Sequence, residues 1–342
     1  METIKAAIIG VTGYSGIELY RLLRQHPHIE VQSVHASQSV GQNLSDLFPH
    51  IGNGQEIIIE AVDSEQIMKT VDLVFLATPS GYSKDMAGLF LEQDFPVVDL
   101  SGDYRLPAEA YEKWYDKPAA PASEQERFTY GLSEWTNLFG KKFISNPGCY
   151  ATATLLSLLP LVDIIDEKSI IVDAKSGLTG AGKSLTASSH FVQAYGNYST
   201  YKLNRHQHIP EIMQVLQAHN PDIPHLQFST SLLPINRGIV ATSYLHLKDG
   251  MTEEDVDLAF KEAYKESAFV QLHGHQFPDL HQVVGSNRVA IGWEYNPRTE
   301  VLTVMTVLDN LIKGAAGQAI QNVNLMYGFP ETAGLDNLAS YI

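Results

Sequence analysis

The chain has 342 residues, of which 44% are hydrophobic and 18% charged, a mixture typical of a packed globular protein and not of a disordered one. Single cores stop growing at roughly 250–300 residues, so a chain of this length is expected to form two domains. The 23 basic and 39 acidic residues give a net charge of −16, which disfavours nucleic acid as a partner because its phosphates are repelled.

The first half of the chain alternates short β-branched apolar runs with helical segments, the pattern of βαβ units around a parallel sheet. Residues 107–126 hold three prolines among charges and alanines and predict an irregular surface excursion. This half is therefore expected to be an open α/β domain. Strands are predicted at 4–9, 31–35, 56–61, 73–77, 97–100 and 142–145, and helices at 15–25 and 82–93.

The second half has longer strands and predicts an α+β domain. A domain boundary is placed at the turn Asn146-Pro147-Gly148-Cys149, which an apolar helical segment follows up to residue 159. The helical tail at 313–326 has glycines and alanines that suit close packing against backbone or a cofactor, so we expect it to return to the first domain. The alternative is a helix that only closes the second domain. Strands are predicted at 170–174, 239–247, 289–293 and 301–308, and helices at 210–217 and 253–267.

Several absences bear on the compartment. One cysteine cannot form an intrachain disulfide, so nothing in the composition requires oxidising surroundings. The N-terminal sequence METIKAAIIGVTGYSG lacks the basic region and long apolar stretch of a signal peptide. No window approaches the roughly 18 apolar residues that span a membrane. We expect a soluble, cytoplasmic protein that binds neither membrane nor nucleic acid.

The glycine-rich sequence GVTGYSG at residues 10–16 directly follows the first predicted strand and opens the first helix. Glycines at such a place allow a tight turn and bring backbone N–H groups close to a pyrophosphate at the helix N-terminus. The spacing is GxxGxxG and not GxGxxG, so the position in the βαβ unit carries much of the argument. Contacts with a dinucleotide are expected from Gly10, Thr12, Gly13, Tyr14, Ser15 and Gly16.

The end of the second strand indicates which dinucleotide would bind. An acidic residue there would hold the ribose 2′-hydroxyl of NAD and repel a 2′-phosphate. The sequence His35-Ala-Ser37-Gln-Ser39 contains no acid, which permits NADP through the two serine hydroxyls. The alternative is that Ser37 and Ser39 are loop serines without a ligand.

The single cysteine, Cys149, stands in NPGCYAT, where Gly148 permits a sharp turn before a buried helix. A thiol at a helix N-terminus has its pKa lowered toward ~3.5–7.5, which favours a nucleophilic thiolate. Two histidines, His206 and His208, precede a predicted helix and could supply an acid or base for acyl transfer. An inert buried cysteine is the alternative interpretation.

Two further motifs raise rival interpretations. Residues 177–184, GLTGAGKS, match the Walker A pattern after an apolar strand, but the segment that follows is too polar for the helix behind a phosphate-binding loop. The His-x-His pairs at 206–208 and 273–275 have a spacing found in metal ligands, yet no further cysteine or grouped carboxylate completes a set. We predict no metal site; a P-loop nucleotidase and a dinucleotide-sensing protein without activity remain rival hypotheses.

Taken in order, the motifs resemble those of the N-acetyl-γ-glutamyl-phosphate reductase family within the aspartate-semialdehyde dehydrogenase superfamily. The resemblance implies an NADP-binding Rossmann domain at 1–148 and 314–342 and a catalytic and dimerisation domain with a mixed sheet at 149–313. It also implies NADPH-dependent reduction of N-acetylglutamyl 5-phosphate in arginine biosynthesis by a homo-oligomer, either a dimer or a tetramer. The motifs are GVTGYSG (10–16), DLSGDYR (99–105), YGLSE (130–134), NPGCYAT (146–152), SGLTGAGK (176–183), HQHIPEI (206–212), LLPINRG (232–238) and DNLIKGAAGQAIQN (309–322).

The resemblance also implies roles for single residues. Cys149 stands at the family's nucleophile, which forms a thioester, and His208 at its acid or base, which protonates the thiohemiacetal oxygen. Arg105 stands at the phosphate-binding arginine and Asn146 at a neighbouring polar contact. Further cofactor contacts are implied at Pro79, Gly177, Asn310 and Gly314.

The acyl tail of the substrate needs a cation for its carboxylate and partners for its amide, because an unpaired buried charge is costly. Glu211 is the motif-borne acid that the ammonium group of an aspartyl substrate would require. Aspartyl phosphate and aminoadipyl phosphate therefore remain alternative substrates. Candidates for binding the acyl tail are Lys183, Arg205, Arg237, Ser176 and Tyr195.

Overall fold

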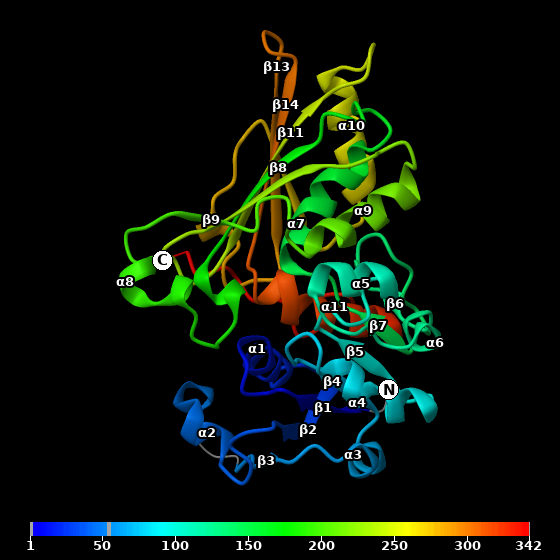
Figure 1. Ribbon diagram of the computed structural model, residues 1–342, viewed down its shortest axis with the longest axis vertical. Coiled ribbons are helices and arrows are strands. Elements are labelled where there is room, and N and C mark those ends of the chain that lie inside the picture. Colours follow the sequence, from blue (N-terminus) through cyan, green and yellow to red (C-terminus); the bar gives the residue numbers. More distant parts are fainter. Residues whose placement is uncertain (1–2, 53–55, 342) are drawn as a thin grey trace. The chain divides into compact units, whose positions relative to one another are not determined.

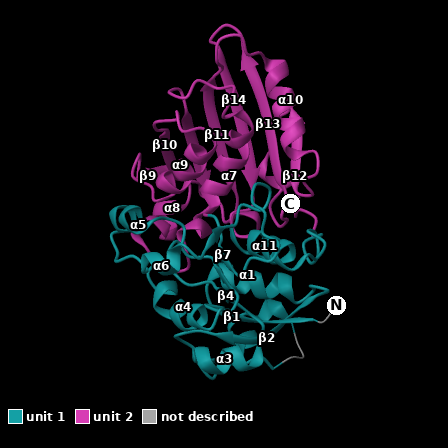
Figure 2. Cartoon of the chain, turned by 90° about the vertical axis from the view of Figure 1, so that its right-hand side faces the viewer, with its two compact units in different colours: residues 1–147, 315–336 teal, residues 148–314, 337–342 magenta. Residues whose placement is uncertain are grey.

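The computed structural model describes residues 3–52 and 56–341, which fall into two compact units (Figure 1, Figure 2). Unit 1 comprises Met1–Pro147 and Ala315–Asp336, and unit 2 comprises Gly148–Gly314 and Asn337–Ile342. The chain thus enters unit 1 a second time at Ala315. The segment that begins at Asn337 belongs to unit 2, whereas the sequence assigned it to the first domain.

Unit 1 is built on a seven-stranded sheet in the order β3-β2-β1-β4-β5-β7-β6, in which every neighbouring pair is parallel. The predicted Rossmann-type sheet is therefore confirmed. β4 is buried along its whole length, as expected of a parallel strand covered on both faces. The strands are β1 (Ile4–Ile9), β2 (Ile29–His35), β3 (Ile59–Glu60), β4 (Leu73–Leu76), β5 (Val97–Asp99), β6 (Thr129–Tyr130) and β7 (Phe143–Ser145).

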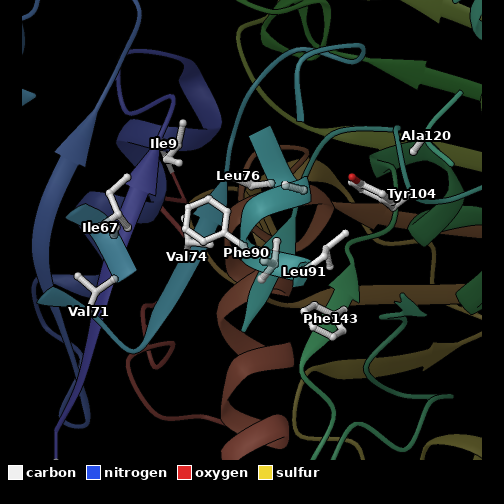
Figure 3. Packing of buried hydrophobic residues seen from close by; sticks show 13 residues of the cluster. Ile9, Ile67, Val71, Val74, Leu76, Phe90, Leu91, Tyr104, Ala120 and Phe143 are labelled. Atoms are coloured by element: carbon white, nitrogen blue, oxygen red, sulfur yellow. The ribbon is translucent and has the colours of Figure 1, made fainter. Parts of the chain in front are cut away.

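Helices of unit 1 pack their apolar faces on this sheet. One cluster of buried side chains joins Ile9 and Leu76 of the sheet to Ile67 of α3 and Phe90 of α4 (Figure 3). The alternate residue Ile8 faces the other side of β1, where α1 packs. The helices are α1 (Tyr14–Leu23), α2 (Leu44–Leu47), α3 (Ser64–Thr70), α4 (Ser83–Glu92), α5 (Ala108–Tyr115), α6 (Ala122–Gln125) and α11 (Gly317–Tyr327).

Residues 107–126 lie mostly at the surface, as expected. The prediction that they are irregular is wrong, because the segment contains α5 and α6. Pro107 and Pro121 precede the two helices directly, so these prolines introduce helices and do not disrupt them. Tyr111 of α5 is fully buried and its hydroxyl donates to Asp103 at 2.7 Å. A short helix in which three of eight residues are charged thus packs through the buried Tyr111.

Unit 2 contains a mixed seven-stranded sheet in the order β12-β13-β14-β11-β8-β10-β9, which confirms the predicted second fold. Only the β12–β13 and β8–β10 pairs among these strands are parallel. The sequence did not predict β10 or β12, because serine, threonine and glutamine interrupt their apolar pattern. The strands are β8 (Ile171–Ser176), β9 (Ser199–Tyr201), β10 (Gln227–Leu232), β11 (Ile239–His246), β12 (Val270–Gly274), β13 (Val289–Asn296) and β14 (Val301–Leu308).

Three helices, α7 (Cys149–Leu158), α9 (His208–His219) and α10 (Glu253–Tyr264), pack in unit 2. α7 contacts α9 and strands β11 and β14. The predicted helix at 210–217 starts two residues earlier, at His208. A fourth helix, α8 (Phe191–Ala194), is short. The predicted tail helix is present, but its first turn, Ile312–Ala316, is π-helical and leads into α11.

Candidate active site

The glycine loop between β1 and α1 is built by two glycines that the surrounding backbone requires. Gly10 has φ +92°, and a Cβ there would lie 2.4 Å from the carbonyl oxygen of Ala77. A Cβ at Gly16 would lie 2.2 Å from the carbonyl oxygen of Gly10. At Gly13 the nearest atom would be 3.4 Å away, so the protein's own packing does not demand a glycine at this position.

That pattern fits a dinucleotide, because the middle glycine of such loops lets a pyrophosphate approach the backbone. α1 begins directly after Gly13, and its first turn contains no acidic residue. Thr12, Tyr14 and Ser15 lie at the same helix N-terminus, whose dipole attracts a phosphate. The residues present at this loop therefore suit the pyrophosphate of a dinucleotide.

At the end of β2, His35 is buried and has a structural role. Its Nδ1 lies 3.0 Å from the carbonyl oxygen of Ala61, and its Nε2 lies 2.9 Å from the hydroxyl of Ser33. Ser37 beyond it is exposed, and Ser39 has the left-handed φ of +64°. The two serines therefore stand on a turn after the strand.

The loops after β4 and β5 are joined by Asp103, which the sequence did not single out. Its carboxylate accepts from the backbone N–H of Gly81 at 2.6 Å and of Lys84 at 3.2 Å. Asp99 is fully buried nearby, and burial, followed by the charge of Asp103, raises its pKa to about 6. Pro79 lies on the first of these loops and is exposed.

The guanidinium of Arg105 is oriented by two backbone carbonyls of unit 1. Its Nε donates to the oxygen of Asn146 at 2.7 Å, and its Nη2 donates to the oxygen of Leu100 at 2.9 Å. These acceptors follow the ends of β7 and β5. Asn146 itself is fully buried, and its side chain is engaged within unit 1, where Nδ2 donates to the carbonyl of Ala315 at 3.1 Å.

Cys149 is the first residue of α7 and is half-buried. The N–H of the preceding Gly148 donates to Oε1 of Glu211 at 2.7 Å. Gly314 packs against the cysteine so closely that a Cβ there would lie 2.7 Å from Cβ of Cys149. The first turn of the helix itself, residues 149–152, contains no acidic side chain, and the helix dipole favours a thiolate there. The carboxyl group of Glu211 lies at the same N-terminus and opposes this effect.

His208 is likewise the first residue of its helix, α9, which packs against α7. Glu211 lies one turn further along α9, so its bond to Gly148 ties the two helix N-termini together. The ring of His206 is 4.6 Å from that of His208. Burial, then the charge of His208, lowers the pKa of His206 to about 2, so His206 is neutral. Unit 2 thus brings Cys149, His208 and Glu211 to one place.

Two tyrosines form a hydroxyl cluster beside these groups. The Tyr201 hydroxyl donates to that of Tyr150 at 3.2 Å, and the Tyr150 hydroxyl donates to the carbonyl of Ser231 at 3.3 Å. Burial is the main cause that raises the pKa of both, that of Tyr201 to about 12, and Ser176 interacts with Tyr150. The sequence pointed to Ser176 but missed both tyrosines, although Tyr150 directly follows the cysteine.

Three other predicted substrate residues are exposed, and a fourth forms an ion pair. Lys183 and Arg205 are exposed, and Tyr195 is 73% exposed and stacks on Phe191. Arg237 pairs with Asp309 at 3.4 Å. Lys183, Arg205 and Tyr195 therefore stand at the surface of unit 2.

Three predicted cofactor residues lie in unit 2. A Cβ at Gly177 would lie 2.7 Å from the carbonyl oxygen of Asn236. The buried Asn310 accepts from the N–H of Gly238 at 2.7 Å and donates to the hydroxyl of Thr179 at 3.0 Å. Gly177 and Asn310 thus join loops within unit 2, and Gly314, as described, packs on Cys149.

The Walker-like segment does not have the geometry of a P-loop. β8 is followed by a 3₁₀ helix at Leu178–Ala181, and the next α-helix, α8, has four residues. Within residues 3–52 and 56–341, no three His, Cys, Asp or Glu side chains are grouped as metal ligands would be. Among the residues that the structure describes, no helix is long and apolar enough to cross a membrane.

Comparison with protein families matches both halves of the chain to one group. Residues 5–138 match the semialdehyde dehydrogenase NAD-binding domain, and residues 149–310 match the semialdehyde dehydrogenase dimerisation domain. The N-acetyl-gamma-glutamyl-phosphate reductase of Streptococcus mutans is 55% identical over 99% of this chain and 100% of its own. The reductase of Listeria monocytogenes is 46% identical over 99% and 100% of the two chains.

Solved structures with similar folds are aspartate semialdehyde dehydrogenases. The enzyme II of Vibrio cholerae, in complex with ASA, has a TM-score of 0.67 at 17% identity and covers 95% of this chain and 98% of its own. The Candida albicans enzyme with NADP has a TM-score of 0.65 at 18% identity with the same coverage. At these identities the likeness concerns the fold alone.

Proposed function

The chain belongs to the N-acetyl-γ-glutamyl-phosphate reductase family, and we propose that Cys149 and His208 carry out its reaction. The protein reduces N-acetyl-L-glutamyl 5-phosphate with NADPH to N-acetyl-L-glutamate 5-semialdehyde and phosphate, a step of arginine biosynthesis. The observation that carries the residue assignment is the bond from Gly148 to Glu211, which joins the helix that begins with the cysteine to the helix that begins with the histidine.

In the first step the Cys149 thiolate attacks the acyl carbon. A carbon–sulfur bond forms, the bond from that carbon to the phosphate oxygen breaks, and phosphate leaves with the electron pair. The N-terminus of α7 favours the thiolate beforehand and the negative charge on the acyl oxygen during attack. The product of this step is a thioester on Cys149.

In the second step the thioester is reduced to the aldehyde. NADPH, when bound, supplies the hydride that converts the thioester into a thiohemiacetal. His208 gives a proton to the oxygen of this group and takes it back as the carbonyl forms. The carbon–sulfur bond then breaks and returns its electron pair to Cys149.

Arg105 would hold the phosphate of the substrate. A guanidinium is suited to phosphate because it offers planar, charged donors, and the bonds to Asn146 and Leu100 fix the orientation of this one. In this proposal Asn146 acts through Arg105, because its own side chain is bonded within unit 1. Glu211, which accepts from the N–H of Gly148, would position the start of α7.

Unit 1 would bind NADP through the glycine loop. The backbone around Gly10, Gly13 and Gly16, with Thr12, Tyr14 and Ser15, would hold the pyrophosphate. Ser37 and Ser39 would face the 2′-phosphate, where an acid would be unfavourable. Pro79, on the exposed loop after β4, would border the same ligand.

The acyl tail would bind beside the hydroxyl cluster of unit 2. Tyr150, Tyr201 and Ser176 offer hydrogen-bonding groups for the amide, and Arg205 or Lys183 could supply the cation for the carboxylate. Tyr195 would take part only if its exposed segment folds over the ligand. We also propose a cytoplasmic homo-oligomer, since residues 149–310 match a dimerisation domain and the relatives are named for a biosynthetic step.

Aspartyl phosphate is disfavoured because Glu211, the acid that could meet its ammonium group, is fully buried against Gly148. The test compares kcat/KM for N-acetylglutamate semialdehyde and aspartate semialdehyde in the reverse, phosphate-dependent direction. A preference below about tenfold, roughly 1.4 kcal/mol, would count against the proposed substrate. In the same assay Cys149→Ser should lose ~10³-fold or more in activity and keep its NADPH affinity; loss of less than tenfold would refute the nucleophile.

A further inference from the structure

Helix α11 carries buried amide side chains, among them Asn322 and Asn324, and both are 0% exposed. Buried amides are costly unless their donors and acceptors find partners. Each of these two makes three hydrogen bonds, but to different parts of unit 1. Because the two amides bond to different parts of unit 1, a role in the active site can be tested separately from a role in stability.

Asn322 reaches the segment that leads into the catalytic cysteine. Its Nδ2 donates to the carbonyl of Gly131 at 2.8 Å and to Oδ1 of Asn146 at 3.0 Å. Its own oxygen accepts from the hydroxyl of Ser133 at 2.6 Å. The amide thus links α11 to the segments that follow β7 and β6.

Asn146 connects Asn322 to Arg105 through hydrogen bonds. Its side chain is held at one end by Asn322 and at the other by the carbonyl of Ala315, at 3.1 Å. Its backbone N–H donates to the carbonyl of Asp99 at 2.8 Å. With both side chain and backbone held, its carbonyl oxygen is a fixed acceptor for Nε of Arg105 at 2.7 Å.

We propose that Asn322 is a positioning residue that orients the phosphate-binding Arg105 through Asn146. The inference rests on the proposed function, in which Arg105 holds the phosphate. Loss of the Asn322 amide would release one end of the Asn146 side chain and allow the carbonyl that holds the guanidinium to shift. A misplacement of about 1 Å at a reacting group can cost on the order of 10²-fold.

Asn324 provides a matched control on the same helix. Its Nδ2 donates to the carbonyls of Glu331 and Ala333 at 3.0 and 2.9 Å, and its Oδ1 lies 2.9 Å from Nε2 of His26. It has the same residue type, burial and number of bonds as Asn322. None of these bonds reaches Asn146 or Arg105.

The experiment measures the phosphate-dependent oxidation of N-acetylglutamate semialdehyde for wild type, Asn322→Ala, Asn324→Ala and Arg105→Lys. We expect Asn322→Ala to raise KM for phosphate roughly tenfold, as Arg105→Lys does, with KM for NADP within about twofold of wild type. Asn324→Ala should lower the melting temperature by a similar amount and leave KM for phosphate within about twofold.

Equal changes in KM for phosphate in the two asparagine variants, or no change in Asn322→Ala, would overturn the inference about Asn322. In that case a raised KM for phosphate in Arg105→Lys would still support the proposed function. An Arg105→Lys enzyme with an unaltered KM for phosphate would overturn both. If Asn322→Ala does not fold, Ser133→Ala removes the 2.6 Å bond to Asn322. Ser133→Ala should raise KM for phosphate and leave KM for NADP within about twofold of wild type. An unchanged KM for phosphate would refute the proposed role of Asn322.

Discussion

Replacing Gly314 by alanine would press a methyl group onto the proposed nucleophile. The new Cβ would lie 2.7 Å from Cβ and 3.2 Å from Cα of Cys149. Carbon atoms in contact normally lie about 3.5–4.0 Å apart, so the two must separate by roughly 1 Å. Gly314 does not have a positive φ, so alanine is compatible with its backbone and the effect comes from the contact.

Hydrogen bonds hold the segments on both sides of this contact in place. The π-helical turn is held by Asp309, whose carboxylate accepts from the N–H groups of Leu311 at 2.8 Å and Ile312 at 3.2 Å. On the other side, Gly148 is held by Glu211. We therefore expect part of the displacement to occur at the thiol of Cys149. Misplacement by about 1 Å predicts a loss of ~10² in kcat/KM, or about 2.7 kcal/mol, with an overpacking cost of about 1–3 kcal/mol in stability.

Two assays check this prediction. Steady-state kinetics measure kcat/KM, and the alkylation rate of the single cysteine reports directly on the thiol. Gly88→Ala on α4 is the control, because its Cβ would have no neighbour closer than 3.9 Å, and its kinetics should match wild type. If Gly314→Ala keeps kcat/KM within threefold and its alkylation rate is unchanged, the contact does not position Cys149.

Three other substitutions test separate parts of the site. Glu211→Ala should be less stable to urea than Glu211→Gln by about 1–3 kcal/mol, since only glutamine retains an acceptor for the buried N–H of Gly148; equal stability would contradict this bracing role. Burial and Asp103 raise the pKa of Asp99 to about 6. Above pH ~4 the unfolded chain releases the proton of this carboxyl group, whereas the folded protein keeps it up to about pH 6. The contribution of Asp99 to the free energy of unfolding therefore falls as pH rises from about 4 to 6. Asp99→Asn, which cannot ionise, should therefore gain up to about 3 kcal/mol relative to wild type between pH 4 and pH 7 in urea unfolding; a difference independent of pH would refute the assignment. Gly16→Ala should weaken NADPH binding at least tenfold in a fluorescence titration, because its Cβ would lie 2.2 Å from the glycine-loop backbone; unchanged affinity would show that the loop does not bind the dinucleotide.

Much of the candidate site was visible in short stretches of sequence. The glycine loop, the cysteine at a helix start and the histidine before Ile-Pro-Glu each lie within a few residues, where turn chemistry and helix periodicity can be read directly. The buried roles of Glu211 and Asn322 were not visible, because a pattern of polar residues on a helix predicts an exposed face. The position of Glu211 one turn after His208 was the available signal.

Sequence patterns predicted the local elements and their chemical groups: a parallel α/β unit opened by a glycine loop, a thiol at a helix N-terminus and a family whose motifs recur in order. The contacts by which distant segments hold those groups were not predictable from such patterns. The bond from Gly148 to Glu211 spans 63 residues and that from Asn322 to Asn146 spans 176, and Gly314 meets Cys149 from the far end of unit 2. Periodicity reports on neighbours along one helix or strand, whereas these contacts depend on how whole elements pack and on the need of every buried polar group for a partner.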